Sequence, residues 1–430
     1  MNKLTATLFS AIFIYLFVIP IPGNAQGETT MLFLKISPSP VVNGMGVAGT
    51  ALPSMDPSAF YNNPAQLGYM SRALNASYQF YPGNTDWLAG FKLSNLYYSA
   101  WTLTGGYNFQ NLSPDLPFSF GVGYLHGGIN YGTSLIIDDN NNKIESVESR
   151  EYFDAFSFGT SINYFFNINA GLTYKTVNSS LVSGVNVTKD QLNEAKVNAL
   201  DFGVLVTIPI YPVAHTIRPP LSPLSPPTRT FVNFSIGYAK TNIGDKVQYT
   251  NFNTEDPIPR TAKLGYALSM GIPVRASNTL LWGIVIDWTA EAEDLLIDRA
   301  SQEYKGGLWG EINPYRNIIL LKHDEKVNVH FGFQIQLLEA LSFRWGQFNG
   351  PGYASPDYGP PRTWGFSITS DGLLKLLTPK TKASELVFIR EHFKIQYHWS
   401  RYYLKKDQFN NYHPLHGTKF QGLTIAVTGF

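Results

Sequence analysis

The 430-residue chain has no cysteine, few charged residues and none of the common cofactor motifs. Without cysteine, disulfides, thiol chemistry and thiolate metal sites are excluded. Charged residues make up 15% of the chain, against roughly 25% in ordinary soluble domains. The formal net charge is +1, which gives no reason to expect nucleic acid as a partner. The sequence contains no phosphate loop, zinc motif or dinucleotide fingerprint, so we expect no cofactor.

Long apolar runs are also missing after the first 25 residues, so no transmembrane helix is expected. Those 25 residues have the pattern of a secretory signal peptide. Lys3 supplies the positive charge, Leu8 to Ile19 is almost entirely apolar, and residues 23–25 are small or polar. We expect cleavage near Ala25. A membrane anchor is the alternative, but the apolar run is short and ends at Pro20.

Aromatic residues are plentiful, at 14% of the chain, and many short stretches alternate between apolar and polar residues. Residues 327–337 read VNVHFGFQIQL, in which every second side chain is apolar. A period of two is typical of a β-strand with one apolar and one polar face. The pattern recurs along most of the chain behind an export signal. This combination favours an all-β fold, a transmembrane antiparallel β-barrel with a lipid-facing exterior and a polar lumen.

We expect about fourteen barrel strands. The predicted strands are residues 86–93, 97–109, 117–126, 152–163, 167–177, 199–210, 230–240, 261–271, 279–290, 327–337, 341–347, 362–369, 392–402 and 418–430. Residues 74–81 also alternate and are a possible fifteenth strand. Bacterial barrels have an even strand number, short periplasmic turns and longer external loops. We therefore assign residues 74–81 to the N-terminal segment.

This choice places both ends of the barrel in the periplasm and the long connections outside the cell. The expected external loops are residues 127–151, 178–198, 241–260, 291–326, 348–361 and 403–417. Two longer connections remain on the periplasmic side. Residues 211–229 are rich in proline and form either a stiff loop or a docking strip. Residues 370–386 contain DGLLKLL, a short amphipathic helix that fits the membrane interface.

The predicted organisation is a signal peptide at residues 1–25, an N-terminal hatch segment at 26–85 and a barrel at 86–430. The N-terminal segment is punctuated by glycine and proline and carries an ordered set of motif residues. These are Gly44, Met45, Gly46, Asp56, Ala59, Asn63, Pro64, Ala65 and Leu67. Glycine permits tight packing or positive φ, and Asp-Pro and Asn-Pro pairs fix turns. On physical grounds alone, these residues fold the segment and need touch no ligand.

The ordered set resembles the N-terminal signature of PorV/PorQ-type outer-membrane proteins, which belong to the superfamily of the long-chain fatty-acid transporter FadL. Residues 258–266 and 362–366 also look like strands of this group, and the resemblance covers residues 31–430. It implies a fourteen-stranded barrel with an N-terminal hatch. Many members carry an arginine shortly before the first glycine, whereas residues 41–43 here are Val-Val-Asn.

The resemblance implies two functions. PorV/PorQ-type members assist the type IX secretion system of the Bacteroidetes group and handle exported proteins at the outer membrane. By that reading, the partners are translocon components or exported proteins, bound by external loops such as 291–326 with Trp309 and Pro314. In the FadL branch, hydrophobic ligands pass through the barrel wall. The alternative is therefore a transporter of hydrophobic small molecules, with a pocket between hatch and wall. Both readings place the chain in the lipid of an outer membrane.

Three groups of polar residues lack the partners that catalysis or metal binding requires. His398 and Ser400 share the polar face of one strand and suggest a lipid-acting enzyme, but no orienting carboxylate or GxSxG motif accompanies them. Residues 323–325 (His-Asp-Glu) end a polar loop and fit a solvated surface. Residues 138–142 loosely resemble a calcium loop without its sixth-position glycine and twelfth-position glutamate. We therefore expect no catalytic residue and no metal site.

Overall fold

The computed structural model describes residues 29–93, 95–137, 143–182, 192–211, 230–250, 254–276, 279–298, 301–351, 358–378 and 383–429. The predicted signal peptide, the Pro-rich connection beyond Tyr211 and residues 138–142 lie outside these ranges.

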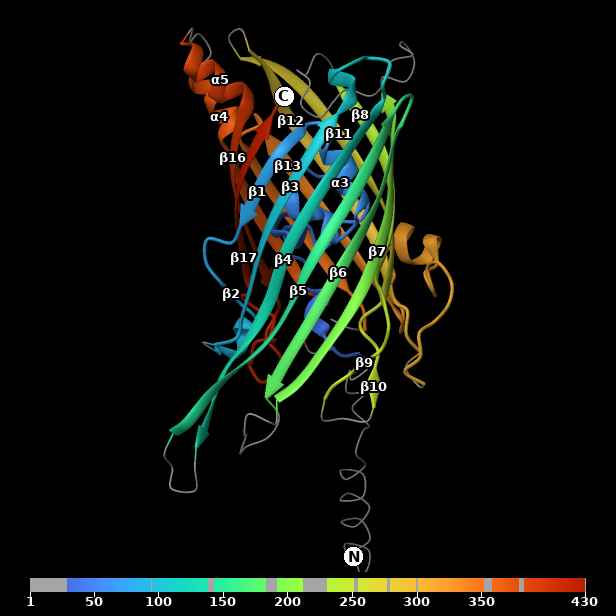
Figure 1. The fold of residues 1–430 in the computed structure, drawn as a ribbon. Coiled ribbons are helices and arrows are strands. Elements are labelled where there is room, and N and C mark those ends of the chain that lie inside the picture. Colours follow the sequence, from blue (N-terminus) through green and yellow to red (C-terminus); the bar gives the residue numbers. More distant parts are fainter. Residues whose placement is uncertain are drawn as a thin grey trace, which may run out of the picture.

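Among the described residues, fourteen antiparallel strands form a closed barrel (Figure 1), which confirms the predicted fold class. The barrel strands are β1 (Leu74–Phe80), β3 (Tyr97–Asn108), β4 (Phe118–Ile137), β5 (Lys143–Asn163), β6 (Asn167–Val182), β7 (Leu192–Tyr211), β8 (Phe231–Gly244), β11 (Thr261–Ala276), β12 (Thr279–Leu295), β13 (Val327–Leu337), β14 (Leu341–Asn349), β15 (Arg362–Thr369), β16 (Phe393–Tyr403) and β17 (Lys419–Thr428). Each strand pairs with its neighbour in the chain. The sheet closes because β1 pairs with both β17 and β3.

Short elements decorate this barrel. Three two-residue strands, β2 (Thr85–Asp86), β9 (Val247–Gln248) and β10 (Glu255–Asp256), lie in connections. The helical elements are η1 (Leu32–Lys35), α2 (Pro40–Gly44), η2 (Pro57–Tyr61), α3 (Ala65–Met70), η3 (Ala89–Phe91), η4 (Phe109–Asn111), the π-helix η6 (Pro314–Ile319), α4 (Ser370–Leu377) and α5 (Ser384–His392). Within the described ranges, every helix is too short or too polar to traverse a bilayer.

The first barrel strand is not the one we predicted. Residues 74–80 form β1, whereas residues 86–93 comprise the end of the two-residue strand β2 and a turn that contains η3. Leu88 and Lys92 both adopt positive φ, which ends any extended run there. The count of fourteen was right because one strand replaced the other. The barrel therefore begins at Leu74, before the predicted boundary at residue 86.

Two predicted loops are instead largely strand. Residues 127–137 and 143–151 continue the β4–β5 ladder, with Asn130 opposite Arg150. Residues 178–182 and 192–198 likewise extend β6 and β7. The outward residues of these extensions include the exposed Glu148, Arg150, Glu194 and Lys196, so the outward apolar stripe is lost. On β7 the apolar Ala195 and Val197 face inward instead. Backbone hydrogen bonds still hold the ladder, because they do not depend on an apolar face.

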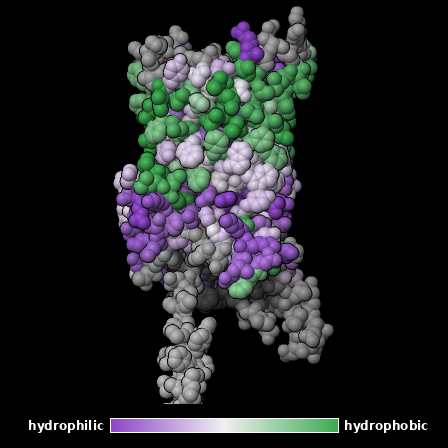
Figure 2. Space-filling view, turned by 180° about the vertical axis from the view of Figure 1, so that it is seen from behind, coloured by the Kyte–Doolittle hydropathy of each residue, from purple (hydrophilic) through white to green (hydrophobic). Residues whose placement is uncertain are grey.

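The outer surface divides into two zones (Figure 2). Apolar residues cover the barrel toward the end that carries α4 and α5, and hydrophilic residues cover the opposite part. Outward apolar side chains that are exposed include Leu103, Val122, Phe156, Phe158, Leu172, Ile236, Leu268, Phe343, Trp345 and Ile395. We call this surface the apolar belt. An exposed apolar band around a closed barrel is what contact with lipid requires.

The two rims of the barrel differ. One rim, the short-turn rim, carries the turns at residues 164–166 and 338–340 together with α4 and α5. The other, the long-loop rim, carries the connections at 81–96, 245–260, 296–326, 350–361 and 404–418. That the short-turn rim faces the periplasm stays a prediction.

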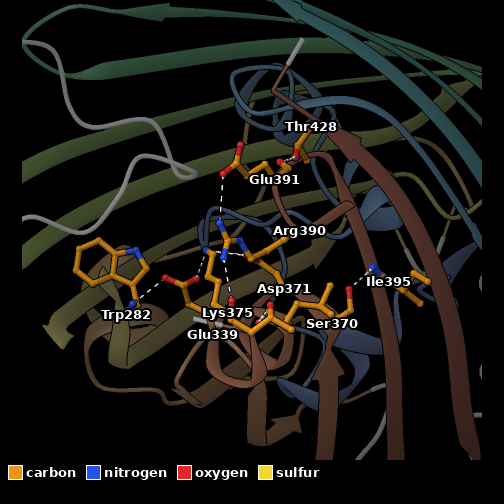
Figure 3. A network of polar contacts seen from close by, with 11 residues as sticks. Trp282, Glu339, Ser370, Asp371, Lys375, Arg390, Glu391, Ile395 and Thr428 are labelled. Carbon is orange, nitrogen blue, oxygen red and sulfur yellow. Dashed lines mark hydrogen bonds and ion pairs between the residues drawn. The ribbon is translucent and has the colours of Figure 1, made fainter. Parts of the chain in front are cut away.

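The predicted helix within residues 370–386 is present as α4. The second helix, α5, was not predicted from the sequence pattern. Polar contacts fasten α4 to the short-turn rim (Figure 3). The Lys375 Nζ lies 2.6 Å from Glu339 and 3.1 Å from Asp371, and Glu339 accepts a hydrogen bond from the Trp282 backbone. A Cβ on Gly372 would come within 2.2 Å of the Leu338 carbonyl oxygen. Close backbone packing and an ion-pair network thus hold α4 in place.

Candidate functional site

Residues 29–73 lie against the inner face of the barrel, and several of the predicted motif residues make close backbone contacts with it. A row of four glycines crosses β4 to β7 in register: Gly121, Gly159, Gly171 and Gly203. The helix α3 and the turn before it rest on this row. A Cβ on any of the four would lie within 3 Å of the N-terminal segment. These positions therefore require glycine so that two backbones can meet.

The motif residues that pack against the glycine row are the Asn63-Pro64-Ala65 triplet and Leu67. The Asn63 side chain donates to the carbonyl oxygens of Thr50, at 2.7 Å, and Val204, at 3.2 Å, and accepts from the Ala65 backbone at 3.0 Å. A Cβ on Gly171 would come within 2.3 Å of the Pro64 carbonyl oxygen. One asparagine thus links the segment to itself and to the wall, which explains its place in the motif.

The Gly44-Met45-Gly46 motif makes a second close backbone contact between the N-terminal segment and the barrel wall. Gly332 on β13 and Gly346 on β14 are cross-strand neighbours, and both contact the backbone of Met45 or Gly46. Gly46 has φ +67, and a Cβ there would meet the Phe331 carbonyl oxygen at 2.4 Å. Glycine is therefore needed at position 46 both for the positive φ and for the close approach to the β13 backbone.

Asp56 and Ala59 belong to a buried polar junction. The Asp56 carboxylate accepts hydrogen bonds from the Ser39 hydroxyl, from the Ser58 backbone at 3.1 Å and from the Gln79 side chain at 2.8 Å. Ala59 is fully buried, and its backbone donates to the Asp56 carbonyl oxygen at 3.0 Å. Because Gln79 lies on β1, this junction ties the segment to the first strand of the barrel.

The lumen also contains buried charges that the sequence pattern did not reveal. Lys175 on β6 and Asp201 on β7 form an ion pair at 2.7 Å, with side chains at most 1% exposed. On β12, Glu291 accepts from the Thr50 backbone at 2.8 Å and Glu293 lies 3.3 Å from Lys35. Several wall charges are therefore satisfied by the N-terminal segment. The motif residues and these charges together anchor the segment.

None of the motif residues lines the cavity that lies nearby. A cavity of about 420 Å³ opens between the N-terminal segment and the long-loop rim. Its lining residues are Thr29, Leu32, Lys35, Ile36, Val47, Trp87, Leu88, Phe91, Leu295, Lys326, Asn328, Phe348, Pro351, Tyr402, His413, Pro414 and Leu415. Most of these side chains are apolar. The volume falls in the range of small-molecule sites.

Two loops meet backbone to backbone to form one side of this cavity. The Gly90 backbone donates to the Pro414 carbonyl oxygen at 2.9 Å, and a Cβ on Gly90 would come within 2.2 Å of the His413 carbonyl oxygen. Trp87 packs edge-on against Phe420, with ring centroids 6.5 Å apart. Residues from the first and last connections of the barrel thus share one wall of the cavity.

The polar groups of the cavity are few. Lys35 pairs with Glu293, and Lys326 Nζ lies 3.1 Å from Glu311. Burial lowers the pKa of His413, whose Nδ1 accepts a hydrogen bond from the Leu415 backbone at 3.1 Å. At neutral pH this imidazole is therefore uncharged. The cavity offers an apolar body with two ammonium groups at its edge.

The alternative enzyme site is not assembled. His398 Nδ1 is hydrogen-bonded to Ser367 at 2.6 Å, and Ser367 in turn accepts from Arg344. The Ser400 hydroxyl is buried without a hydrogen-bond partner, so it makes no bond to His398. A nucleophile needs such a bond to its base. The structure thus shows no hydrogen bond between the two residues that the enzyme hypothesis paired.

The remaining polar groupings are local. Asp324 accepts from the backbones of Lys326, at 3.0 Å, and Val327, at 2.8 Å, and so closes a turn. Among the described residues, no group of three or more His, Asp or Glu side chains is placed to hold a metal ion.

Comparisons with known proteins give only architectural likeness. No protein-family model matches the sequence, and no curated protein does. Among solved structures, the chain is similar to the Ralstonia pickettii toluene transporter TbuX, at 13% identity and TM-score 0.42, over 91% of this chain and 97% of that one. It is also similar to a Pseudomonas aeruginosa FadL homologue, at 11% and 0.36, over 91% and 97%. For the Pseudomonas putida toluene transporter TodX the values are 10% and 0.39, over 91% and 96%. At these scores, the likeness says nothing about ligand or partner.

Proposed function

We propose that this chain is a non-enzymatic, FadL-like outer-membrane barrel that binds a hydrophobic small molecule and passes it inward. The observation that supports this proposal is the apolar cavity of about 420 Å³ between the N-terminal segment and the long-loop rim. A secretion accessory needs no such cavity. A transporter does, because a hydrophobic solute must leave water before it crosses the polar surface layer.

The edge of the cavity indicates an amphipathic ligand. Lys35 and Lys326 are cations at an otherwise apolar site. Each is already paired with a carboxylate, so neither is a bare charge in an apolar space. A ligand with an apolar body and an anionic or hydroxyl head can place its chain in the cavity and its head near these ammonium groups.

Binding of dodecane, dodecanol and dodecanoic acid to the full-length protein tests this proposal. Native mass spectrometry of the barrel released from lipid nanodiscs reports bound ligand directly. Leu32→Trp adds bulk to a lining residue that is half exposed, and Leu112→Trp adds the same bulk to an exposed leucine of another connection. We expect wild type and Leu112→Trp to bind and Leu32→Trp to lose binding. Equal binding by all three proteins would rule out this cavity as the site.

A second candidate is the PorV/PorQ-type role in secretion. One observation favours it: the connection after β12 exposes large apolar side chains, among them Trp309 and Tyr315, as a protein-binding loop would. Deletion of the chain separates the two candidates. Retention of exported proteins, with unchanged uptake of the 12-carbon ligands, would favour secretion. The opposite result would favour transport.

A further inference from the structure

The connection after β12 folds back onto the outside of the barrel. We call residues 301–322 the outer-wall loop. On the outer face of β8, the Tyr238 hydroxyl donates to the Leu308 carbonyl oxygen at 2.5 Å, and Lys240 Nζ donates to the Gly307 carbonyl oxygen at 2.9 Å. Figure 1 shows the helical part of the loop beside the barrel wall. The loop therefore covers the wall and leaves the mouth of the barrel to other connections.

The underside of the loop is packed. Ile312 and Ile318 cover Ala290 and Ala292, two small outward residues of β12, and Val327 completes this buried cluster. Alanine at these positions leaves the hollow that the isoleucines fill. This packing fixes which face of the loop meets the wall.

A backbone contact fixes the loop further. The Asp294 carboxylate accepts from the Glu311 backbone at 2.7 Å. Gly310 has φ +59, and a Cβ there would lie 2.1 Å from the same carboxylate. With the underside and the turn both held, the opposite face of the loop points away from the barrel.

Much of the exposed part of the loop is apolar and aromatic, beside the polar residues Gln302, Glu303, Glu311 and Asn313. Five large side chains are between 44% and 68% exposed: Leu308, Trp309, Tyr315, Ile319 and Leu320. Arg316 and Lys322 are exposed beside them. Aromatic, aliphatic and cationic side chains together are typical of the boundary between lipid and water. A face of this composition exposed only to water would be unusual.

We propose that the outer-wall loop is a membrane-surface anchor whose apolar face contacts lipid at the edge of the apolar belt. Outward aromatic side chains of β12 and β13 lie next to the loop. Phe331 of β13 packs against the buried cluster beneath the loop and stacks on Trp288 of β12, with ring centroids 5.8 Å apart. The surface that meets lipid on the barrel therefore continues onto the loop. This inference rests on the barrel lying in a membrane and is independent of the cavity.

The absence of cysteine in the chain allows a direct test with single spin labels. The full-length protein is reconstituted in phosphatidylcholine vesicles with a label at Ile319→Cys or Leu308→Cys. Leu268→Cys on the outer face of β11 is the lipid control, and Glu325→Cys, an exposed polar residue just after the loop, is the water control. Retained heat-modifiable mobility on gels shows that each variant is folded. Collision with oxygen reports lipid, and collision with a water-soluble nickel chelate reports water.

We expect the labels at residues 308 and 319 to lose access to the nickel chelate and keep access to oxygen, as at residue 268. Nickel access equal to that at residue 325 would overturn the proposal, because the loop would then lie in water. Protection from both reagents would overturn it as well. That result would mean that a protein, either a second copy or a secreted partner, covers the loop.

Discussion

The side chain of Asn63 fills the place that a Cβ would take on Gly203. The Asn63 Oδ1 lies 1.9 Å from that position. Gly203 belongs to the row of wall glycines on which the N-terminal segment rests, and Asn63 also holds Thr50 and Val204. A motif residue and a wall residue 140 positions apart thus depend on each other, and one methyl group is enough to disturb both.

Gly203→Ala is expected to loosen the N-terminal segment and leave the barrel folded. The added methyl group overlaps Asn63, and overpacking of this kind costs about 1–3 kcal/mol. Limited proteolysis in native membranes measures the effect as faster cleavage within residues 40–70. Gly105→Ala is the matched control, because the nearest atom to its Cβ would lie 3.7 Å away. Equal cleavage of both variants would show that the position of the segment does not depend on the contact between Asn63 and Gly203.

Asp201→Asn is expected to destabilise the barrel strongly. Lys175 would lose its negatively charged partner, and the neutral groups beside it among the described residues would be Asn242 and the face of the Tyr61 ring, 4.1 Å away. Removing one member of a buried ion pair typically costs about 3–5 kcal/mol. Urea unfolding of the barrel refolded in lipid vesicles measures the loss.

The double variant Lys175→Met with Asp201→Leu is the control for this ion pair. It removes both charges, and apolar replacement of a buried pair is often nearly neutral. We therefore expect it to recover most of the stability that Asp201→Asn loses. If the double variant is as unstable as the single one, packing rather than unpaired charge is responsible.

Lys35→Met is expected to change which 12-carbon ligand the cavity prefers. Glu293 keeps Lys263 as a partner at 3.2 Å, so the wall stays paired. The ammonium group at the edge of the cavity is lost, and an exposed ionic contact is worth about 0.2–1 kcal/mol. Binding of dodecanoic acid should therefore weaken by up to about fivefold relative to dodecane. If binding of both ligands weakened equally, Lys35 would contribute only packing to the cavity.

The attachment of α4 is expected to depend on alkaline pH. Burial lowers the pKa of Lys375, but the carboxylates of Asp371 and Glu339 outweigh it and leave the pKa above the ordinary lysine value. A base with a raised folded pKa contributes stability below its unfolded pKa, about 10.4, and loses it as pH rises through the folded value. A fall in the amide protection factors of α4 above pH 10.5, after correction for base-catalysed intrinsic exchange, checks this. Lys375→Met should have lower protection factors at neutral pH and show no further fall.

Alternation along the chain was enough to predict the barrel, because a wall between lipid and a polar lumen imposes a period of two. The first strand was assigned wrongly, since residues 74–81 and 86–93 both alternate and only pairing with β3 and β17 distinguishes them. The extensions of β4 to β7 escaped notice for a related reason. Outward residues such as Glu194 and Lys196 are polar there, so the outward apolar stripe ends while backbone pairing continues.

The sequence by itself determined the class of fold and the positions where the N-terminal segment needs glycine or a turn. These are local properties, set by periodicity and backbone freedom. Only the tertiary structure decided which wall glycines face Asn63 and Met45, that Lys175 forms an ion pair with Asp201, and where the cavity lies. Leu32, Trp87 and Leu415 come from three distant parts of the chain. They become neighbours only because the strand that opens the barrel pairs with the strand that closes it.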